Sequence, residues 1–331
     1  MTEPARIPLH FAVPVWGPSY VKTFCDYSVP SQISAGNLGS VSSTAAYTIY
    51  TTEQDAAPLS PAIEALSSFA DVRLELIAPS DNKYDLKSSC YRDALQRAVA
   101  AGAALFLLNA DIILADGFVQ SVERMLAGGA RVLLIAGPRA LLRPMCDALE
   151  QFRDGRSIRI GPADLSRLWL RNIHPLLRMH FVDGEGEAFH PSHLYWRAGD
   201  EAVIARCFHL YPIVVRPRAA VKFAGTIDDD LAGNLGCADS EMVFATDSRE
   251  LFACELSPEE HYVGTITTRG NQKAVVEFYR RHARRNLDYL RHEMIITGAE
   301  RLGLRGHYAR LRSALYVRSI FRDYFARGET T

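Results

Sequence analysis

Along residues 1–140, strand-like and helix-like patterns alternate. Five short stretches are either continuously apolar or alternate between apolar and polar residues, as β-strands do: residues 7–15, 46–51, 72–77, 105–108 and 131–135. Three intervening stretches repeat their apolar residues every three or four positions, as amphipathic helices do: residues 60–69, 90–101 and 118–126. Strands that alternate with helices form βαβ units, so we expect an α/β fold built on a mostly parallel sheet.

Beyond about residue 140 the pattern changes. We expect a helix over 164–172, strands over 202–206 and 213–216, and an acidic, glycine-containing loop over 226–240. From residue 271 the chain becomes helical. Its apolar residues step by three or four positions and predict one continuous stripe: Val276, Tyr279, Ala283, Leu287, Leu290 and Met294. A second helix is expected over 308–325, so these segments should pack on the α/β domain or on a second copy in a homo-oligomer.

The composition is that of an ordinary globular protein. Apolar residues make up 48% and charged residues 23% of the 331 residues, which allows a large core. The six cysteines are scattered without a C-x-x-C pair, which favours reduced thiols in a cytoplasmic protein. The first residues lack the pattern of a secretory signal, and no run of about 20 apolar residues predicts a membrane span.

The charge is unevenly distributed. The whole chain has a formal net charge of −1, whereas residues 271–331 hold thirteen Lys or Arg against six Asp or Glu. Basic helical segments are most often solvated, but such a segment also suits an anionic membrane surface. Peripheral contact with the inner membrane face is therefore an alternative. No nucleic-acid-binding motif accompanies the basic residues, so we expect no nucleic-acid partner.

Residues 104–118 (ALFLLNADIILADGF) carry the clearest chemical signal. An apolar run ends abruptly at Asn109-Ala110-Asp111. A run of this kind fits a strand that is buried on both faces of a parallel sheet. Asp111 would then lie at the carboxyl end of the strand, where open α/β sheets bind their ligands. A carboxylate at that place can hold a divalent cation against a diphosphate.

This stretch resembles the D-x-D segment of GT-A-type, nucleotide-sugar-dependent glycosyltransferases of bacterial glycan assembly. Upstream, residues 91–102 resemble the helix that precedes D-x-D in that family, with Arg92-Asp93 in place of the usual Arg-Asn pair. The resemblance covers roughly residues 7–140. It implies a GT-A (Rossmann-like) fold with a mixed, mostly parallel sheet flanked by helices. The catalytic domain would span 1–265, divided near 140 into nucleotide-binding and acceptor halves, with a basic helical extension over 266–331.

The resemblance also implies a donor site. Nucleotide-sugar contacts are expected at the end of the first strand, after the second strand, and around the acidic motif: Pro14, Val15, Trp16, Glu53, Arg92, Asn109, Ala110 and Asp111. Mn²⁺ or Mg²⁺ would bridge Asp111 and the diphosphate, with Asn109 and His209 as further ligands. Asn109 replaces the first Asp of the motif and supplies a neutral oxygen, which bears on the strictness of the metal requirement.

The implied reaction is transfer of a hexosyl group from the nucleotide sugar to a glycan, lipid-linked or protein acceptor. An inverting enzyme needs a base to deprotonate the acceptor hydroxyl. The candidates are Asp228 and Asp229 in the acidic loop, with Glu201 as their rival. A retaining enzyme needs no dedicated base at that place.

Two other functions remain open. Sugar-phosphate nucleotidyltransferases have a related fold, but they usually carry a glycine-rich, basic loop after the first strand. Here that segment contains the single glycine Gly17. A non-catalytic protein that binds a partner through the basic tail is the other alternative, because Asn109 weakens the acidic motif.

Overall fold

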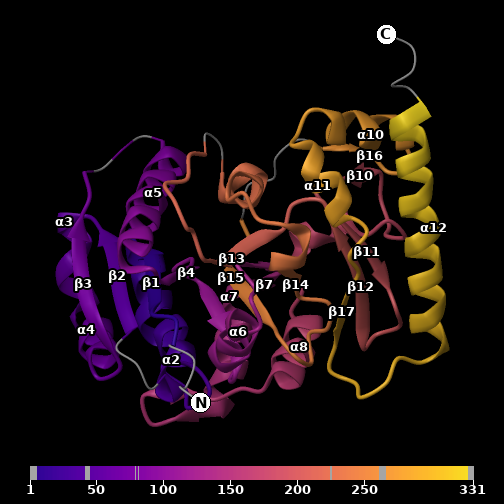
Figure 1. Ribbon diagram of the computed structural model, residues 1–331. Helices are drawn as coiled ribbons and strands as arrows, with labels where there is room; N and C mark the ends of the chain where they lie inside the picture. Colours follow the sequence, from indigo (N-terminus) through magenta and orange to yellow (C-terminus); the bar gives the residue numbers. More distant parts are fainter. Residues whose placement is uncertain are drawn as a thin grey trace, which may run out of the picture.

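A mixed β-sheet forms the centre of the computed structural model, in which residues 6–41, 45–78, 80, 82–223, 226–260 and 266–326 are described, without the side chains of 229 and 230 (Figure 1). Within these residues the sheet has seven strands in the order β14-β6-β13-β4-β1-β2-β3. β13 runs antiparallel to both neighbours, and the other pairs are parallel. The strands are β1 Leu9–Pro14, β2 Ala45–Thr51, β3 Ala70–Leu76, β4 Ala104–Leu107, β6 Val132–Ile135, β13 Tyr211–Val215 and β14 Met242–Phe244.

Helices cover both faces of this sheet. Side chains of β4 alternate between the two faces, with Leu105 and Leu107 in one apolar cluster and Phe106 in the other. The long helix α5 (Lys83–Ala101) packs on the first face. Shorter helices lie around the sheet, and α1, α2, α4 and α6 contribute to the second cluster: α1 Pro18–Thr23, α2 Val29–Gln32, α3 Glu53–Ala56, α4 Ser60–Ser67 and α6 Phe118–Ala127. Burial on both faces explains the unbroken apolar run that precedes Asn109.

A small sheet extends the carboxyl edge of the central sheet. It consists of β5 (Ile112–Leu114), β15 (Ala253–Ser257) and β7 (Arg139–Leu141), in the order β5-β15-β7. The backbone N–H of Leu256 donates to the carbonyl of Asp111 at 2.9 Å. This sheet therefore brings residues far apart in sequence beside the acidic motif. Helices α7 (Leu142–Leu149) and α8 (Pro162–Arg171) pack against it.

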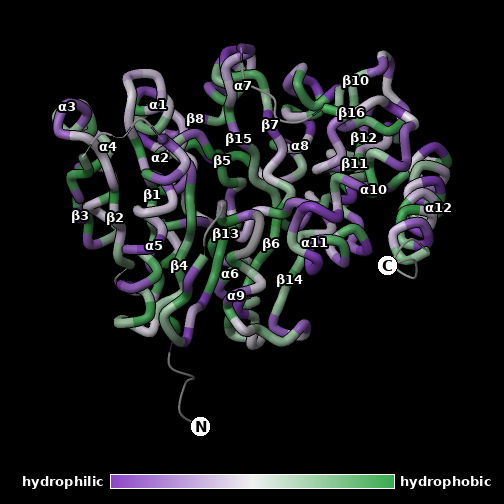
Figure 2. The backbone as a smooth tube through the Cα atoms, turned by 90° about the horizontal axis from the view of Figure 1, so that it is seen from above, coloured by the Kyte–Doolittle hydropathy of each residue, from purple (hydrophilic) through white to green (hydrophobic). Residues whose placement is uncertain are grey.

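A third sheet and the C-terminal helices form a separate apolar cluster at one side of the molecule (Figures 1 and 2). The sheet has the order β11-β12-β17 and is covered by α12. The elements are β11 His193–Arg197, β12 Ala202–Cys207, β17 Met294–Thr297, α10 Gln272–Arg280, α11 Arg284–Tyr289 and α12 Leu304–Ala326. Short elements complete the fold: β8 Arg153–Asp154, β9 Ser157–Ile158, β10 Ala188–Phe189, β16 Thr267–Thr268 and α9 Ala232–Asn234.

The predicted fold class is confirmed: a mixed, mostly parallel sheet is flanked by helices and followed by a C-terminal helix. The predicted helices over 164–172 and 308–325 correspond to α8 and α12. The continuous helical stripe up to Met294 was wrong. The chain forms two helices there, and Met294 opens β17, because Ile295 and Ile296 complete the sheet edge beside β12. The division at residue 265 stays a prediction.

Among the described residues, no helix combines the length and apolar character needed to cross a bilayer.

Arg206 ties the C-terminal helix to the third sheet. Its side chain is 9% exposed. Its Nε donates to Ser313 Oγ of α12 at 2.9 Å, its Nη1 donates to the Leu290 carbonyl at 3.1 Å, and its Nη2 pairs with Glu293 at 3.2 Å. These contacts join β12, α12 and the segment before β17 through a single buried cation.

We therefore expect Arg206→Met to lower the free energy of unfolding by about 3 kcal/mol, because it leaves buried acceptors without their donor. Chemical denaturation followed by circular dichroism measures the change. Arg318→Met, at an exposed position on the same helix, is the control and should stay within about 0.5 kcal/mol of wild type. Equal stability of all three proteins would contradict the structural role of Arg206.

Candidate functional site

The carboxyl ends of β1 and β4 meet at one edge of the central sheet. The two strands are adjacent and parallel, with Ala12 paired to Leu107, so the residues that follow them converge. A cavity of about 180 Å³ lies there and is called the donor cavity below. Its lining includes five of the predicted donor residues: Pro14, Trp16, Asn109, Ala110 and Asp111.

Charged residues that the sequence analysis did not single out complete the donor cavity. Lys83 and Lys87 come from the first two turns of α5, Arg139 from the start of β7, and Glu255 from the middle of β15. The side chain of Asn82 caps α5 by accepting from the backbone N–H of Tyr84 at 3.1 Å, which fixes the start of the helix. The cavity therefore combines two carboxylates with three cationic side chains.

Asn109 is held in place by three neighbours. Its amide nitrogen donates to Glu255 Oε1. Its Oδ1 lies 3.1 Å from the hydroxyl of Tyr91 and 3.3 Å from that of Tyr211, and both hydroxyls can donate to it. The side-chain oxygen expected to bind metal is thus already engaged. The role of Asn109 as a metal ligand stays a prediction, and its oxygen would have to leave both tyrosines first.

Asp111 and Glu255 form a pair of like charges. Asp111 is 9% exposed. Burial, followed by the negative charge of Glu255, raises the pKa of the Asp111 carboxyl well above its usual range, while Arg139 and Lys87 act in the opposite direction. Arg139 Nε lies 3.8 Å from Glu255 Oε2. Arg139 and Lys87 therefore offset only part of the repulsion between the two carboxylates. A further positive charge beside them would reduce the rest.

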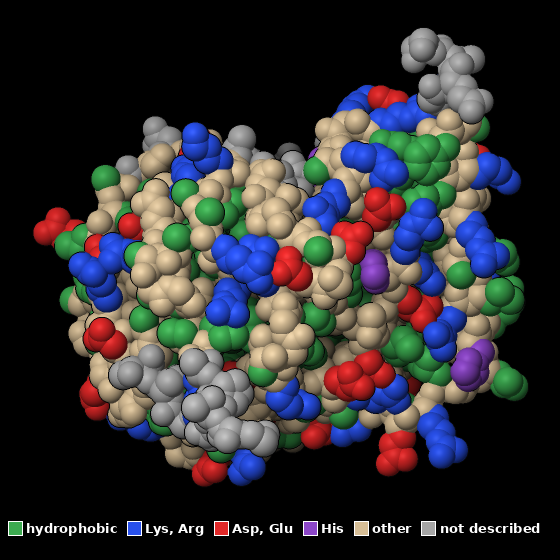
Figure 3. All heavy atoms as spheres, viewed as in Figure 1, with side chains coloured by type: hydrophobic (Ala, Val, Ile, Leu, Met, Phe, Trp, Pro, Cys, Tyr) green, Lys and Arg blue, Asp and Glu red, His purple; other side chains and the backbone are tan. Residues whose placement is uncertain are grey.

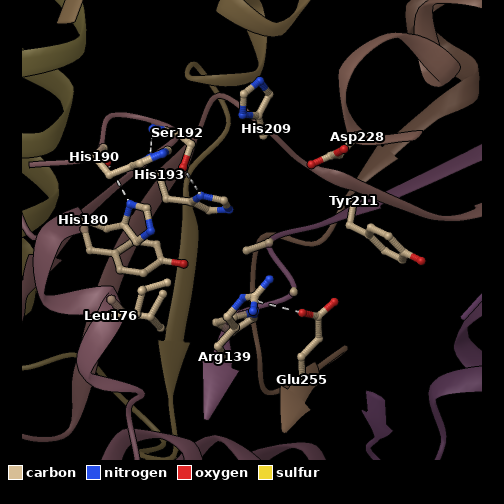
Figure 4. Close-up of a pocket in the computed structure, with 15 residues that line it drawn as sticks. Arg139, Leu176, His180, His190, Ser192, His193, His209, Tyr211, Asp228 and Glu255 are labelled. Carbon is tan, nitrogen blue, oxygen red and sulfur yellow. Dashed lines mark hydrogen bonds and ion pairs between the residues drawn. The ribbon is translucent and has the colours of Figure 1, made fainter. Parts of the chain in front are cut away.

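A second cavity of about 220 Å³ adjoins the donor cavity, and we call it the histidine cavity (Figure 4). Arg139 and Glu255 line both. Four histidines contribute to the lining: His180, His190, His193 and His209. The rings of His180 and His193 lie 5.2 Å apart, centroid to centroid. Ser192 Oγ lies 3.0 Å from Nδ1 of His193.

Three of these histidines, His180, His190 and His193, are uncharged at neutral pH. Burial, followed by repulsion from His190, lowers the pKa of His180 to about 3. Burial, followed by His209, lowers the pKa of His190 to about 4. Burial also lowers the pKa of His193 well below its usual range. A neutral imidazole offers one donor and one acceptor, so this cavity suits an uncharged polar group such as a hydroxyl.

Asp228 connects the two cavities. It lines the histidine cavity and also a third hollow, which contains Asn109, Tyr211, Arg139 and Glu255. Figure 4 shows Asp228 facing the cavity across from the histidines. Asp228 and His209 both line the histidine cavity, which shares Arg139 and Glu255 with the donor cavity of Asp111. The predicted base Asp229 has its side chain outside the described residues.

Four predicted residues are placed elsewhere. Val15 is fully buried in the core beside β2. Glu53 is exposed at the start of α3. Arg92 is exposed, with its guanidinium 5.6 Å from the Phe223 ring centroid. Glu201 lines a different hollow with Arg167 and Arg171. Their side chains line none of the three adjoining cavities, because they leave their elements on other faces. Their predicted site roles stay predictions.

His209 also differs from expectation. It lines the histidine cavity but does not line the donor cavity of Asp111. Within the described residues, no three His, Cys, Asp or Glu side chains form a group that could hold a metal ion. The ligand set of Asp111, Asn109 and His209 stays a prediction.

Comparison with known proteins adds little. No protein-family model matches the chain, and no curated protein matches it. A solved structure that matches is a protein from Bacillus anthracis assigned as a glucose-1-phosphate thymidylyltransferase, in complex with sucrose. The match has a TM-score of 0.27 and 9% identity, and it covers 41% of this chain. The chain spans 57% of that protein's length, which is less than two thirds.

The burial of Asp111 and its repulsion from Glu255 lead to a prediction about the pH dependence of stability. The pKa of Asp111 is higher in the folded protein than in the unfolded chain. At pH values between these two, the folded protein binds more protons than the unfolded chain. The free energy of unfolding therefore falls as the pH rises through this range. Asp111→Asn removes this cost, which amounts to about 1.4 kcal/mol for each pKa unit. We expect the Tm of Asp111→Asn to be higher than that of wild type, and this difference to be larger at pH 8 than at pH 5.

Differential scanning calorimetry at the two pH values tests this. Glu53→Gln, an exposed carboxylate on α3, is the matched control and should change neither Tm nor its pH dependence. A loss of stability in Asp111→Asn at pH 8 would show that the carboxylate is not under the repulsion described.

Proposed function

We propose that the protein is a glycosyltransferase that transfers a hexosyl group from a nucleotide sugar. The observation that carries the proposal is the meeting of Asp111 and Glu255 with the cationic side chains of Lys83, Lys87 and Arg139 in the donor cavity. Glycosyl transfer releases a nucleoside diphosphate, and its developing negative charge must be stabilised by preorganised cations and donors. The donor cavity supplies such groups from several directions.

A divalent cation of the kind that the resemblance implies, Mn²⁺ or Mg²⁺, fits the pair Asp111 and Glu255. Mg²⁺ is commonly bound by one or two carboxylates together with substrate phosphates and water. The repulsion that raises the pKa of Asp111 is the electrostatic condition that a cation between the two carboxylates would relieve. When bound, the ion would supply Lewis-acid stabilisation of the departing diphosphate.

Asn109 supports this arrangement as an amide. Its nitrogen donates to Glu255 and its oxygen faces the hydroxyls of Tyr91 and Tyr211. An aspartate at position 109 would place a third negative charge against Glu255 and would have no hydrogen to donate to it. Glu255 thus provides, from β15, the second carboxylate that the acidic motif itself lacks.

The histidine cavity would bind the acceptor. Its neutral imidazoles, the Ser192 hydroxyl and the Tyr195 side chain present hydrogen-bonding groups to a hydroxyl-bearing acceptor such as a glycan. Asp228 lies at the junction with the donor side. In an inverting reaction Asp228 would take the proton of the acceptor hydroxyl. The hydroxyl oxygen would then bond to the anomeric carbon. The diphosphate would leave with the electrons of the broken C–O bond.

Nucleotidyl transfer to a sugar phosphate is the second candidate. Lys83, Lys87 and Arg139 would also suit a nucleoside triphosphate. The loop after β1 speaks against it, because the backbone N–H of Gly17 donates to the buried Asp55 at 2.9 Å and is not offered to a phosphate. In this reaction a phosphate oxygen of the sugar phosphate would attack the α-phosphorus, and pyrophosphate would leave.

A binding and turnover screen separates these functions. Nucleotide sugars should stabilise the protein in the presence of Mn²⁺, by about 2.7 kcal/mol at 100 times Kd, and Glu255→Gln should lose the Mn²⁺-dependent part. Product analysis then compares nucleotide sugar plus glycan acceptors with nucleoside triphosphate plus sugar 1-phosphate. Turnover of the second mixture alone would establish nucleotidyl transfer. Binding without turnover of either would indicate a non-catalytic protein.

The proposed base gives a separate prediction. Asp228→Asn should lower kcat by about 10²–10⁴-fold, because the acceptor hydroxyl loses its proton acceptor, while the Kd for the nucleotide sugar stays unchanged. Glu201→Gln, at the rival carboxylate in the other hollow, should keep full activity. A fall in kcat for Glu201→Gln with normal activity of Asp228→Asn would reverse the assignment. Full activity of both variants would favour a retaining reaction.

A further inference from the structure

Helix α12 (Leu304–Ala326) has two apolar faces, and only one of them is covered. The inner face is buried against the third sheet and α10 and contains Ala309, Val317, Ile320 and Phe321. This packing accounts for the position of the helix along the side of the molecule (Figure 1). It does not account for the apolar residues on the opposite side.

The outer face of α12 exposes large apolar side chains: Leu304 at 90%, Tyr308 at 63%, Leu311 at 58%, Leu315 at 53% and Phe325 at 50%. The first four are spaced by four, three and four residues, so they form one line along the helix. Arg318 and Arg322 continue the same line towards Phe325. Half or more of each apolar side chain is thus in contact with water, which is unusual for a row of large residues on one helix.

Arginines flank this outer face, and three of them, Arg310, Arg312 and Arg322, are paired with carboxylates. Residues 304–326 contain five arginines and one acidic residue, Asp323. Arg305 and Arg312 lie beside the apolar line, and Arg312 also lies over the Tyr308 ring, 5.8 Å from its centroid. In Figure 3, Lys and Arg side chains and hydrophobic side chains lie along the edge of the molecule formed by α12.

This combination identifies the kind of partner. A second copy of the chain, paired through the same face, would bring these arginines against each other, and like charges oppose such pairing. An anionic lipid surface offers both complements: phosphate and carboxylate headgroups for the arginines, and the acyl boundary for Leu304, Leu311 and Leu315. Each basic residue near an anionic bilayer strengthens association by roughly fivefold.

We propose that the outer face of α12 is a docking surface for anionic lipid bilayers. The protein would lie on the membrane through this helix, with the helix axis along the surface, and would not cross it. Binding is reversible, because one amphipathic face with a few cations gives a salt-sensitive attachment. The inference rests on α12 alone and does not depend on the reaction at the donor cavity.

The test is flotation of the full chain with vesicles of phosphatidylcholine and with vesicles that also contain 30 mole per cent phosphatidylserine, the probe chosen here for an anionic lipid. Wild type should partition to the anionic vesicles at least about tenfold more strongly than to the neutral ones, and less at higher salt. Leu311→Ser with Leu315→Ser should lose about tenfold or more of this binding. Arg318→Gln with Arg322→Gln should lose binding and reduce its salt dependence.

The matched control is Leu76→Ser. Leu76 is 60% exposed on β3, the edge strand at the side of the molecule opposite to α12 (Figure 1). Its replacement should therefore leave flotation unchanged. Tm and circular dichroism of each variant show that the fold is retained. Equal partitioning to neutral and anionic vesicles would overturn the proposal. So would a dimer, seen by light scattering, that dissociates in Leu311→Ser with Leu315→Ser, because the face would then belong to a second copy.

Discussion

The candidate site depends on the buried carboxylate of Asp111 and the partly buried carboxylate of Glu255 beside it. Asp111 follows β4 and Glu255 lies in β15, and the negative charge of Glu255 adds to burial in raising the pKa of Asp111. The protein offsets part of the cost of ionising Asp111 with the amide of Asn109 on one side and the guanidinium of Arg139 on the other. In the proposed function, a cation between the two carboxylates would offset the rest of that cost.

The same contacts join donor and acceptor sides into one cleft. Arg139 and Glu255 line the donor cavity, the histidine cavity and the hollow between them. Of the charged residues, Lys83 and Asp111 line only the donor cavity, where a diphosphate would leave in the proposed reaction. On the other side, His180, His190 and His193 are kept neutral by burial. This separation suits a reaction between a charged donor and an uncharged hydroxyl acceptor.

The sequence predicted what depends on local pattern. The apolar run before Asn109 required a strand buried on both faces, so the position of Asp111 at a strand end could be inferred. The sequence could not show that Glu255 lies beside Asp111. The two residues are 144 positions apart, and they meet because β15 pairs with β5. The signal available in the sequence was Glu255 itself, a charged residue between the apolar Cys254 and Leu256. Met294 was assigned to a helix because periodicity alone cannot reveal that its segment pairs with β12.

The most direct test of the central claim is to locate an ion and a phosphate in the cleft. A crystal of the protein soaked with Mn²⁺ and inorganic pyrophosphate, measured with anomalous scattering from manganese, shows both without assuming a nucleoside or a sugar. The account predicts manganese between the carboxylates of Asp111 and Glu255, with the pyrophosphate towards Lys83 and Lys87. Manganese bound elsewhere, with pyrophosphate outside the donor cavity, would contradict it.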